Sequence, residues 1–229
     1  MKKIIVILLA PMIVIGQSTH IPDDDFEQSL INLGYDTILD DSVLTEAIDT
    51  VTFLHLGFFI NNIYDLTGIE DFSALKELTI WHQFLTTLDL SQNTLLESLN
   101  CTGNNLTHLD LSNNPALTSL ICSENQLSSL DLRNNSNVIS LTTTNNLNLN
   151  CINVDDINFA TNNWINNIDP EHYFSNDCSN ITEIKEISKT KKIIKIMDVT
   201  GKETTLKLNT LMLYKYKDNK TEKIIIKSY

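Results

Sequence analysis

The stretch from Lys76 to Val138 reads KELTIWHQFLTTLDLSQNTLL, ESLNCTGNNLTHLDLSNNPAL and TSLICSENQLSSLDLRNNSNV, which is a 21-residue unit written three times without a gap. The shared frame is L-x-[C/I]-x-x-[N/Q]-x-L-x-x-L-D-L-x-x-N-x-x-[L/V]. A fixed period of this length indicates a solenoid, in which each unit buries its apolar edge only against its neighbours. Such a fold favours an extended binding surface over a catalytic pocket.

The two apolar residues of L-x-[C/I] alternate, so both should point inward from a short strand. Successive units would stack them into two core columns. The members are Leu78 and Ile80, Leu99 and Cys101, Leu120 and Cys122, and Leu141 and Thr143. Asn104, Asn125 and Asn146 should form a third column, whose amides pair backbone groups at the turn after the strand. Gln83 takes this place in the first full unit, where we expect a weaker turn.

The regular frame ends on both sides. A longer first coil starts near Val51, and a fourth unit from Ser140 slips by one residue before Cys151. Asp23 or Asp24 should begin a short helix that Gly34 ends, and this helix would cover the first coil. The predicted division is a signal peptide at 1–16, an N-terminal cap at 17–50, repeats at 51–154, a C-terminal cap at 155–184 and a small β tail at 185–229.

The segment from Leu96 to Leu106 matches the pattern L-x-x-L-x-L-x-x-N-x-L, with Cys101 at the third apolar place and Asn104 at the Asn. The chain therefore resembles leucine-rich repeat proteins, and its flanks resemble those of secreted bacterial members. The flanking residues are Ile21-Pro22-Asp23 with Phe26-Glu27, the run Asp65 to Phe72, and Asn163-Trp164. The resemblance implies a solenoid of short parallel β-strands with an irregular convex side, an N-terminal helical cap and a small C-terminal all-β module.

Charge is divided unevenly along the chain, whose net charge is -13. From Ser18 to Ile184 there are 2 basic residues against 24 acidic ones, whereas Lys185 to Tyr229 has 12 Lys against 5 acids. An acidic body should repel nucleic acid, because phosphate binding depends on Lys and Arg. Acidic surfaces also simply keep proteins soluble. The basic tail could bind an acidic partner or its own body.

The N-terminus indicates export. Lys2-Lys3 is a positive n-region, Ile4 to Ile15 is an apolar h-region, and Gly16 is a small residue before the expected cleavage site ahead of Gln17. This pattern is typical of a secretory signal peptide and too short for a stable membrane span. We therefore expect a secreted or cell-surface protein with no transmembrane span in the mature chain.

The four cysteines fall into two pairs. Cys101 and Cys122 occupy the core columns of adjacent coils, where a thiol is a small apolar side chain. Cys151 and Cys178 bracket the C-terminal cap, and exported chains keep disulfides. The sequence predicts a Cys151–Cys178 disulfide and free thiols at Cys101 and Cys122.

Ligand contacts are expected at the solvent-facing positions of the strands. One column is His55, Thr79, Asn100, Ile121 and Thr142, and the next is Gly57, Trp81, Thr102, Ser123 and Thr144. The candidate ligand-binding residues are His55, Thr79, Trp81, His82, Asn100 and Ile121. Trp81 and Ile121 are large apolar side chains at positions that are expected to face solvent. Aromatic anchors are frequent in binding hot spots. Trp81 could instead pack locally over the first repeat.

The sequence contains no recognisable metal-binding or catalytic motif. Asp89, Asp110 and Asp131 recur in Leu-Asp-Leu and should stack as an acidic column, either as solvated carboxylates or bridged by a cation such as Ca²⁺. Their spacing does not match an EF-hand loop. The five histidines show no zinc-protease spacing, and neither G-x-S-x-G nor a phosphate-binding loop occurs. We expect no enzyme activity, no metal and no cofactor.

The tail alternates polar and apolar residues in short runs that predict strands. Three segments carry a similarity to the C-terminal sorting domains of type IX secretion cargo: Ile196 to Lys202, Leu213-Tyr214 and Lys223 to Lys227. That similarity implies a partner in the export machinery. The tail is shorter than usual and lacks a Gly in its last hairpin, and an ordinary appended β-hairpin domain is the other interpretation.

The sequence thus predicts an exported, non-enzymatic leucine-rich repeat protein that binds a protein or glycan at the cell surface. Two other interpretations remain: a structural or self-associating surface protein, and an accessory subunit of a secreted enzyme.

Overall fold

The computed structural model describes residues 16–57, 62–179, 193–197, 211–216 and 221–225. The predicted signal peptide at 1–16 lies outside these ranges except for Gly16. Among the described residues, no helix has the length and apolar content needed to cross a bilayer.

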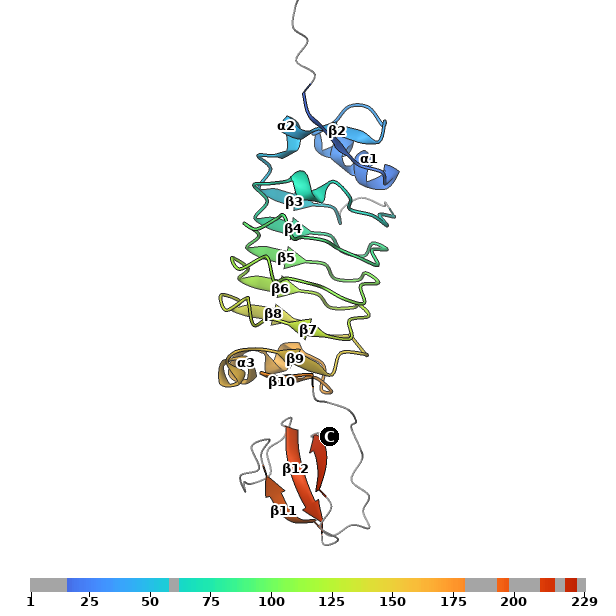
Figure 1. Cartoon of the computed structure of the whole chain (residues 1–229). Coiled ribbons are helices and arrows are strands. Elements are labelled where there is room, and N and C mark those ends of the chain that lie inside the picture. The colour runs from blue at the N-terminus through green and yellow to red at the C-terminus, as the bar shows by residue number, and fades with distance from the viewer. Residues whose placement is uncertain (1–15, 58–61, 180–192, 198–210, 217–220, 226–229) are drawn as a thin grey trace, which may run out of the picture.

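The N-terminal segment is a short antiparallel pair with two helices at one end of the solenoid (Figure 1). Strand β1 (Ser18–His20) pairs with β2 (Ser42–Leu44), and the helices are α1 (Asp24–Leu33) and α2 (Thr45–Ile48). The expected start and end of α1 are confirmed. Asp23 is the N-cap, and its carboxylate accepts from the backbone N–H groups of Asp25 and Phe26. Gly34 ends the helix at φ 84°, a left-handed conformation that suits glycine.

The main sheet consists of five parallel strands, one from each coil, stacked like rungs (Figure 1). The strands in order are β3 (Phe53–His55), β4 (Glu77–Thr79), β5 (Ser98–Asn100), β6 (Ser119–Ile121) and β8 (Ser140–Thr142). Their register follows the repeat, and the equivalent leucines of successive strands are direct Cα partners. These are Leu54, Leu78, Leu99, Leu120 and Leu141. The first coil also contains a short 3-10 helix, η1 (Ile69–Asp71). This architecture is a leucine-rich repeat solenoid.

The C-terminal end of the solenoid changes architecture. A second parallel sheet has the order β10 (Tyr173–Ser175), β9 (Cys151–Asn153) and β7 (Leu130–Asp131). The pairing of Leu130 with Ile152 confirms the predicted one-residue slip. After β9 the chain forms α3 (Ile157–Trp164) and η2 (Ile165–Asn167), a helix that the sequence analysis did not predict. Trp164 is buried, and its indole N–H donates to the Ile139 carbonyl at 3.1 Å.

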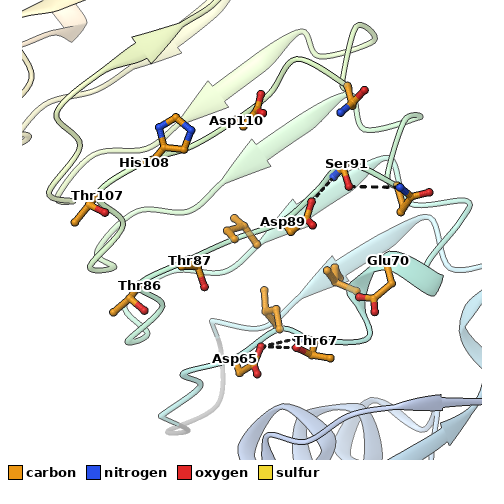
Figure 2. Close-up of a pocket in the computed structure, with 15 residues that line it drawn as sticks. Asp65, Thr67, Glu70, Thr86, Thr87, Asp89, Ser91, Thr107, His108 and Asp110 are labelled. Atoms are coloured by element: carbon orange, nitrogen blue, oxygen red, sulfur yellow. Dashed lines mark hydrogen bonds between the residues drawn. The ribbon is translucent and has the colours of Figure 1, made fainter.

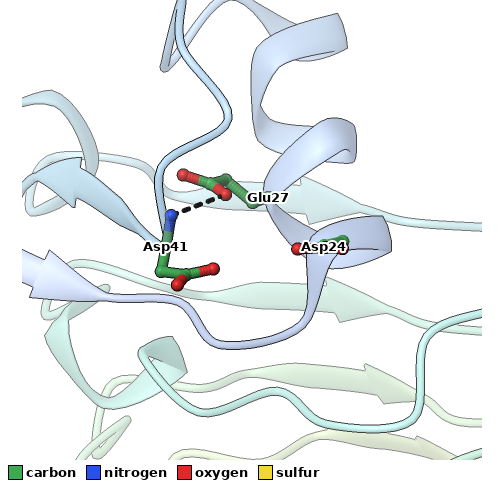
Figure 3. Close-up of side chains that lie close together, drawn as sticks. All are labelled: Asp24, Glu27 and Asp41. Carbon is green, nitrogen blue, oxygen red and sulfur yellow. Dashed lines mark hydrogen bonds between the residues drawn. The ribbon is translucent and has the colours of Figure 1, made fainter.

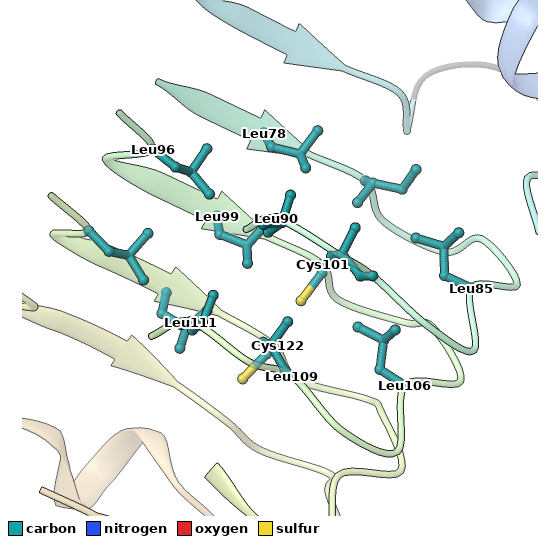
Figure 4. Packing of buried hydrophobic residues seen from close by; sticks show 14 of the residues in the cluster. Leu78, Leu85, Leu90, Leu96, Leu99, Cys101, Leu106, Leu109, Leu111 and Cys122 are labelled. Atoms are coloured by element: carbon teal, nitrogen blue, oxygen red, sulfur yellow. The ribbon is translucent and has the colours of Figure 1, made fainter. Parts of the chain in front are cut away.

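The core is a set of stacked leucine columns between the strands and the opposite side of each coil (Figure 4). The predicted inward pairs from Leu78 to Thr143 are all buried. Each buried Leu contributes roughly 2 kcal/mol of hydrophobic stabilisation relative to exposure. Cys101 and Cys122 replace Ile80 in the second column, which confirms their predicted place in the core.

The predicted asparagine column is confirmed, and its amides bridge neighbouring coils. The Asn125 amide donates to the carbonyls of Cys101, Cys122 and Ser123 at 2.9, 3.2 and 3.1 Å. Its oxygen accepts from the Leu106 N–H at 3.0 Å. One side chain therefore contacts four buried backbone groups. It is the acceptor for the Leu106 N–H, and it shares the Cys101 and Cys122 carbonyls with Asn104 and Asn146. Asn104 and Asn146 make the same pattern one coil away on either side.

A second asparagine column lies on the opposite side of the coils, and the sequence analysis gave it no role. Asn93, Asn114 and Asn135 are buried. The Asn114 amide donates to the carbonyls of Leu90 and Asn93 at 3.0 and 2.9 Å, and Asn135 repeats this on Leu111 and Asn114. The Asn that recurs in L-D-L-x-x-N every 21 residues could have predicted this second column. Two amide columns therefore tie each coil to the one before it.

The cysteine predictions are confirmed. Cys151 and Cys178 form a disulfide across 27 residues, and Cys101 and Cys122 are free and buried. By the chain-entropy model, closing a loop of this length stabilises the fold by on the order of 3 kcal/mol. Burial raises the pKa of Cys101 to about 12 and raises that of Cys122 well above its usual range, so both thiols stay protonated and unreactive.

The tail contains three described strands, β11 (Ile193–Met197), β12 (Leu211–Tyr216) and β13 (Thr221–Ile225). Both pairs are antiparallel, in the order β11-β12-β13. Of the segments that are similar to sorting domains, Asp198 to Lys202 and Ile226-Lys227 lie outside the described residues.

Replacing Asn125 by Ala should lower the free energy of unfolding by about 1–3 kcal/mol, because it leaves the buried Leu106 N–H without its acceptor and removes one donor from each of three carbonyls. Urea denaturation followed by far-UV circular dichroism measures this change. Asn148 is exposed, and Asn148→Ala is the matched control, with an expected change within about 0.5 kcal/mol. Equal effects of the two substitutions would contradict the bridging role of the column.

Candidate functional site

The parallel register brings four of the six predicted binding residues into one column. His55, Thr79, Asn100 and Ile121 end consecutive strands as direct Cα partners, and Thr142 continues the column. All are half-buried, because each side chain stands between its neighbours on adjacent rungs. We call this column the strand face, together with the second outward column, which consists of Gly57, Trp81, Thr102, Ser123 and Thr144. It is rigid, mostly uncharged and rich in hydroxyl and amide groups, with Ile121 as its large aliphatic residue.

Several polar groups on the strand face already make local contacts. His55 Nε2 lies 3.2 Å from a Glu77 carboxylate oxygen. The Asn100 side-chain oxygen accepts from the Thr102 N–H at 3.2 Å, and the hydroxyls of Ser123 and Thr144 lie 3.0 Å apart. These contacts fix the rotamers of the face before any ligand binds, which lowers the entropic cost of binding.

Trp81 does not project freely from the strand face. A Cβ atom built on Gly57, one coil earlier, would lie 1.3 Å from both Cδ1 and Nε1 of the indole. The indole therefore fills the space that any larger side chain at position 57 would occupy. This contact favours local packing over ligand anchoring for Trp81.

His82 is held by the turn rather than by the strand. It has φ 53°, and the equivalent residues of later coils, Gly103, Glu124 and Asn145, have φ 72°, 56° and 62°. The left-handed residue directs the next side chain, Gln83 or an Asn of the column, into the core. Only glycine adopts this conformation without strain, so His82 and Glu124 carry a backbone cost. The His82 ring also covers Gly103, where an added Cβ would lie 2.3 Å from Nδ1.

Gln83 partly reproduces the asparagine contacts. Its side-chain oxygen accepts from the Ile63 N–H at 3.0 Å, as the asparagines do for Leu85, Leu106 and Leu127. Its amide donates to the Trp81 carbonyl at 3.3 Å. The weaker turn that the sequence suggested at this coil stays a prediction.

A groove that the sequence analysis missed crosses three coils on the side of the solenoid that carries the Leu-Asp-Leu segments (Figure 2). It has a volume of about 760 Å³. The acidic residues that line it are Asp65, Glu70, Asp89 and Asp110. The 21-residue recurrence of Asp could have predicted one wall, but the groove itself depends on how the first coil lies beside the next two.

The aspartates of the Leu-Asp-Leu column have a structural contact. Asp89 and Asp110 each accept from the backbone N–H two residues later, on Ser91 and Ser112, at 2.9 Å. These bonds are the main reason why the pKa of each carboxyl lies below its usual range, while the next aspartate of the column opposes the shift in both. Asp131 is paired with Arg133 instead. The column therefore stays ionised near neutral pH.

A second acidic cluster lies in the N-terminal segment (Figure 3). Asp24, Glu27 and Asp41 bring one carboxylate oxygen each within 4.8 Å of the others. Glu27 is buried, and its carboxylate accepts from the backbone N–H groups of Asp40, Asp41 and Ser42 at 2.9 to 3.0 Å. Backbone donors thus already satisfy the central carboxylate, which anchors the loop before β2.

Asp23 links α1 to the first coil. One of its oxygens caps the helix, and the other accepts from the N–H groups of Tyr64 and Asp65 at 2.8 and 3.0 Å. The acidic run at Asp23 to Asp25 therefore begins with a capping residue, as expected from the sequence.

At the other end, Asp169 and His172 terminate the asparagine column. The Asp169 carboxylate accepts from the N–H groups of Asn145 and Asn146 at 2.9 and 3.0 Å. His172 is buried, with Nε2 lying 3.2 Å from the Asn146 carbonyl and Nδ1 lying 3.3 Å from the Thr143 hydroxyl. Burial lowers the pKa of His172, and this effect exceeds the opposing hydrogen bond to Asn146 and the charges of Asp169 and Glu171.

Comparison with known proteins gives matches among internalins. Internalin J of Listeria monocytogenes serotype 4b (strain F2365) is 37% identical over 73 residues, which is 32% of this chain and 8% of that protein. The chain therefore spans a small part of the curated relative. No protein-family profile matches. The repeat pattern and the parallel sheet show a leucine-rich repeat fold, and the similarity to internalin J agrees with it.

Three solved structures from Listeria monocytogenes are similar. The functional domain of InlJ, which includes a cysteine ladder, is 29% identical with a TM-score of 0.45, over 61% of this chain and 38% of that one. The internalin inlF is 20% identical with a TM-score of 0.48, over 67% and 56% of the two chains. Internalin C2 is 18% identical with a TM-score of 0.45, over 74% and 94%.

Replacing Gly57 by Ala should destabilise the fold by about 1–3 kcal/mol, because the new methyl group overlaps the Trp81 indole. In a Trp81→Ala background the same change should cost little, which gives a coupling energy above about 1 kcal/mol in a double-mutant cycle of urea denaturations. Additive effects of the two substitutions would show that the indole does not depend on the space above Gly57.

Stability should fall as the pH drops from 7.5 to 5.0. His172 has a lowered pKa in the folded chain, so the unfolded chain binds a proton first, near its ordinary pKa of about 6.5. The stabilisation is complete above that value and is lost below it, by at most about 1.4 kcal/mol per pH unit. Urea denaturation across this range should show a shallower pH slope for His172→Gln than for the natural chain. Identical slopes would exclude His172 as the source.

Proposed function

We propose that this chain is an exported, non-enzymatic leucine-rich repeat protein that binds a protein ligand through its strand face. The observation that carries the proposal is the unbroken column of His55, Thr79, Asn100 and Ile121 on rigid, in-register strands. Stacked repeats of this kind present extended surfaces on which a partner's side chains meet several coils at once. Amide and hydroxyl groups around one aliphatic residue suit a polypeptide, which offers both hydrogen-bonding groups and apolar side chains.

A glycan ligand is the less favoured choice for this face. The aromatic residue expected to stack on a sugar ring was Trp81, and its indole lies over Gly57 instead. The exposed aromatic ring of β3, Phe53, lies on the first strand, at the edge of the sheet and away from Asn100 and Ile121. The centre of the face therefore lacks the broad apolar contact that usually accompanies hydroxyl recognition in a sugar site.

A photo-crosslinking side chain placed at Ile121 tests the proposal in the cells that make the protein. We expect a discrete crosslinked species of higher mass, which Asn100→Arg on the neighbouring rung should abolish without changing the melting temperature. Thr94 is exposed outside the strand face, and the same probe at Thr94 is the control. Crosslinks that are equal at the two positions, or missing at both, would refute binding at this face.

The identity of the crosslinked partner separates the other interpretations. A second copy of the same chain would favour a structural or self-associating surface protein. A secreted enzyme would favour an accessory subunit. Both alternatives rest on the same exposed column, so mass spectrometry of the crosslinked species distinguishes them from a foreign protein ligand.

We also propose that the tail directs export, on the strength of its similarity to type IX sorting domains. Deleting Ser188 to Tyr229 should then retain the chain inside the cell envelope. Cell fractionation measures this, and unchanged delivery of the truncated chain to the surface or the medium would refute the role of the tail.

A further inference from the structure

The groove on the Leu-Asp-Leu side is negatively charged, and no Lys or Arg of the described body lies in it. Asp65, Glu70, Asp89 and Asp110 line it, all of them exposed, and none of its lining residues is Lys or Arg. We call this feature the acidic groove. Within residues 16–57 and 62–179 the only cationic side chains are Lys76 and Arg133, and these pair with Glu97 and Asp131 outside the groove. No Lys or Arg of the described body therefore neutralises it, and His108 is the one basic side chain in its lining.

The carboxylates are held in place on the groove wall. Asp65 accepts from the N–H and the hydroxyl of Thr67 at 2.8 Å, and Glu70 accepts from the Gly68 N–H at 2.8 Å. Asp89 and Asp110 are fixed in the same way by Ser91 and Ser112. Like charges that local hydrogen bonds hold on adjacent coils, about 5 Å apart, repel one another, and a cation placed between them would relieve this repulsion.

An exposed aromatic pair comes from residues close in sequence to the lining of the acidic groove. The rings of Tyr64 and Phe84 stack with centroids 5.2 Å apart, although 61% of Tyr64 and 42% of Phe84 is exposed. Tyr64 directly precedes Asp65, and Phe84 comes two residues before Thr86, which lines the same end of the groove as Asp65 (Figure 2). Aromatic faces beside carboxylates attract ammonium groups through cation–π and charge interactions together.

The chain itself contains a matching cation source. Lys185 to Tyr229 has 12 Lys and 5 acids, whereas the body from Ser18 to Ile184 has 2 basic residues and 24 acids. The 16 residues from Ser179 to Lys195 can span at most about 50 Å. The chain leaves the solenoid after β10, which is five steps of the stack from the coil of Asp65, a distance of about 24 Å at 4.8 Å per step. The first lysines of the tail can therefore reach the groove.

We propose that the acidic groove is the docking site for the lysine-rich tail of the same chain, with lysines between Lys185 and Lys195 as its occupants. Tethering favours this occupant over a foreign peptide, because the linker holds it at an effective concentration in the millimolar range. The contact is independent of the strand face, so it stands whether or not that face binds a protein.

A zero-length carbodiimide crosslinker, which joins a lysine amine to a carboxylate, tests the contact in the full chain. We expect crosslinks from the tail to concentrate at least fivefold on Asp65, Glu70, Asp89 and Asp110 relative to Glu46, Glu124 and Asp155, which are exposed elsewhere. They should lie within one chain, as a mixture of ¹⁴N- and ¹⁵N-labelled protein shows. Crosslinks spread evenly over all the acids, or joining two chains, would overturn the proposal.

Trypsin cleavage after the tail lysines gives a readout that does not use the groove acids as reactants. The variant Asp65→Asn, Asp89→Asn, Asp110→Asn keeps the oxygens that hold the local turns and removes three charges. We expect its tail to be cleaved at least fivefold faster than that of the natural chain at low salt, with the difference lost in 0.5 M NaCl.

The variant Glu46→Gln, Glu124→Gln, Asp155→Asn removes the same charge away from the groove and should be cleaved at the natural rate. Equal acceleration in both variants would mean that the tail responds only to the overall charge of the body. No acceleration in either would mean that the tail does not occupy the groove.

Discussion

Buried asparagine amides are the interaction on which the rest of this solenoid depends. A coil of 21 residues has a strand of only three, so most of its inward carbonyl and N–H groups find no partner in a sheet. The column at Asn104, Asn125 and Asn146 supplies partners for such groups on one side. On the other side, Asn93, Asn114 and Asn135 add a second donor to carbonyls that backbone turns already pair. Because each amide reaches the preceding coil, the same bonds that satisfy a turn also set the stacking of the repeat.

The ends of the array need different solutions, since no further coil supplies an amide. Asp169 and His172 complete the last turn at one end, and Asp23 holds the first coil to α1 at the other. A disulfide then closes the C-terminal segment. Carboxylates suit these places because one group can accept from two backbone N–H groups at once. Some of the acidic residues in the terminal segments therefore have a structural role, and they account for part of the negative net charge.

The rigid stack separates two surfaces with different chemistry. The strand face offers hydroxyl and amide groups on a flat sheet, where direct Cα pairing spaces every rung equally. The acidic groove offers fixed carboxylates and an exposed aromatic pair, where the irregular first coil meets the regular repeat. A partner on one surface leaves the other accessible, because the two lie on different sides of the coils. Docking of the basic tail in the acidic groove, as proposed, would leave the sheet available.

The repeat alone determined the parallel strands, the inward columns of Leu and Cys, the first Asn column, the one-residue slip and the disulfide, because each follows from a local period or a residue type. Tertiary structure decided what depends on contacts between coils of unlike sequence. The strand pattern predicted that Trp81 faces solvent, but its indole packs over Gly57, one coil earlier. The acidic groove could not be predicted because Asp65 and Glu70 lie outside the regular frame, and only the folded first coil brings them into one groove with Asp89 and Asp110.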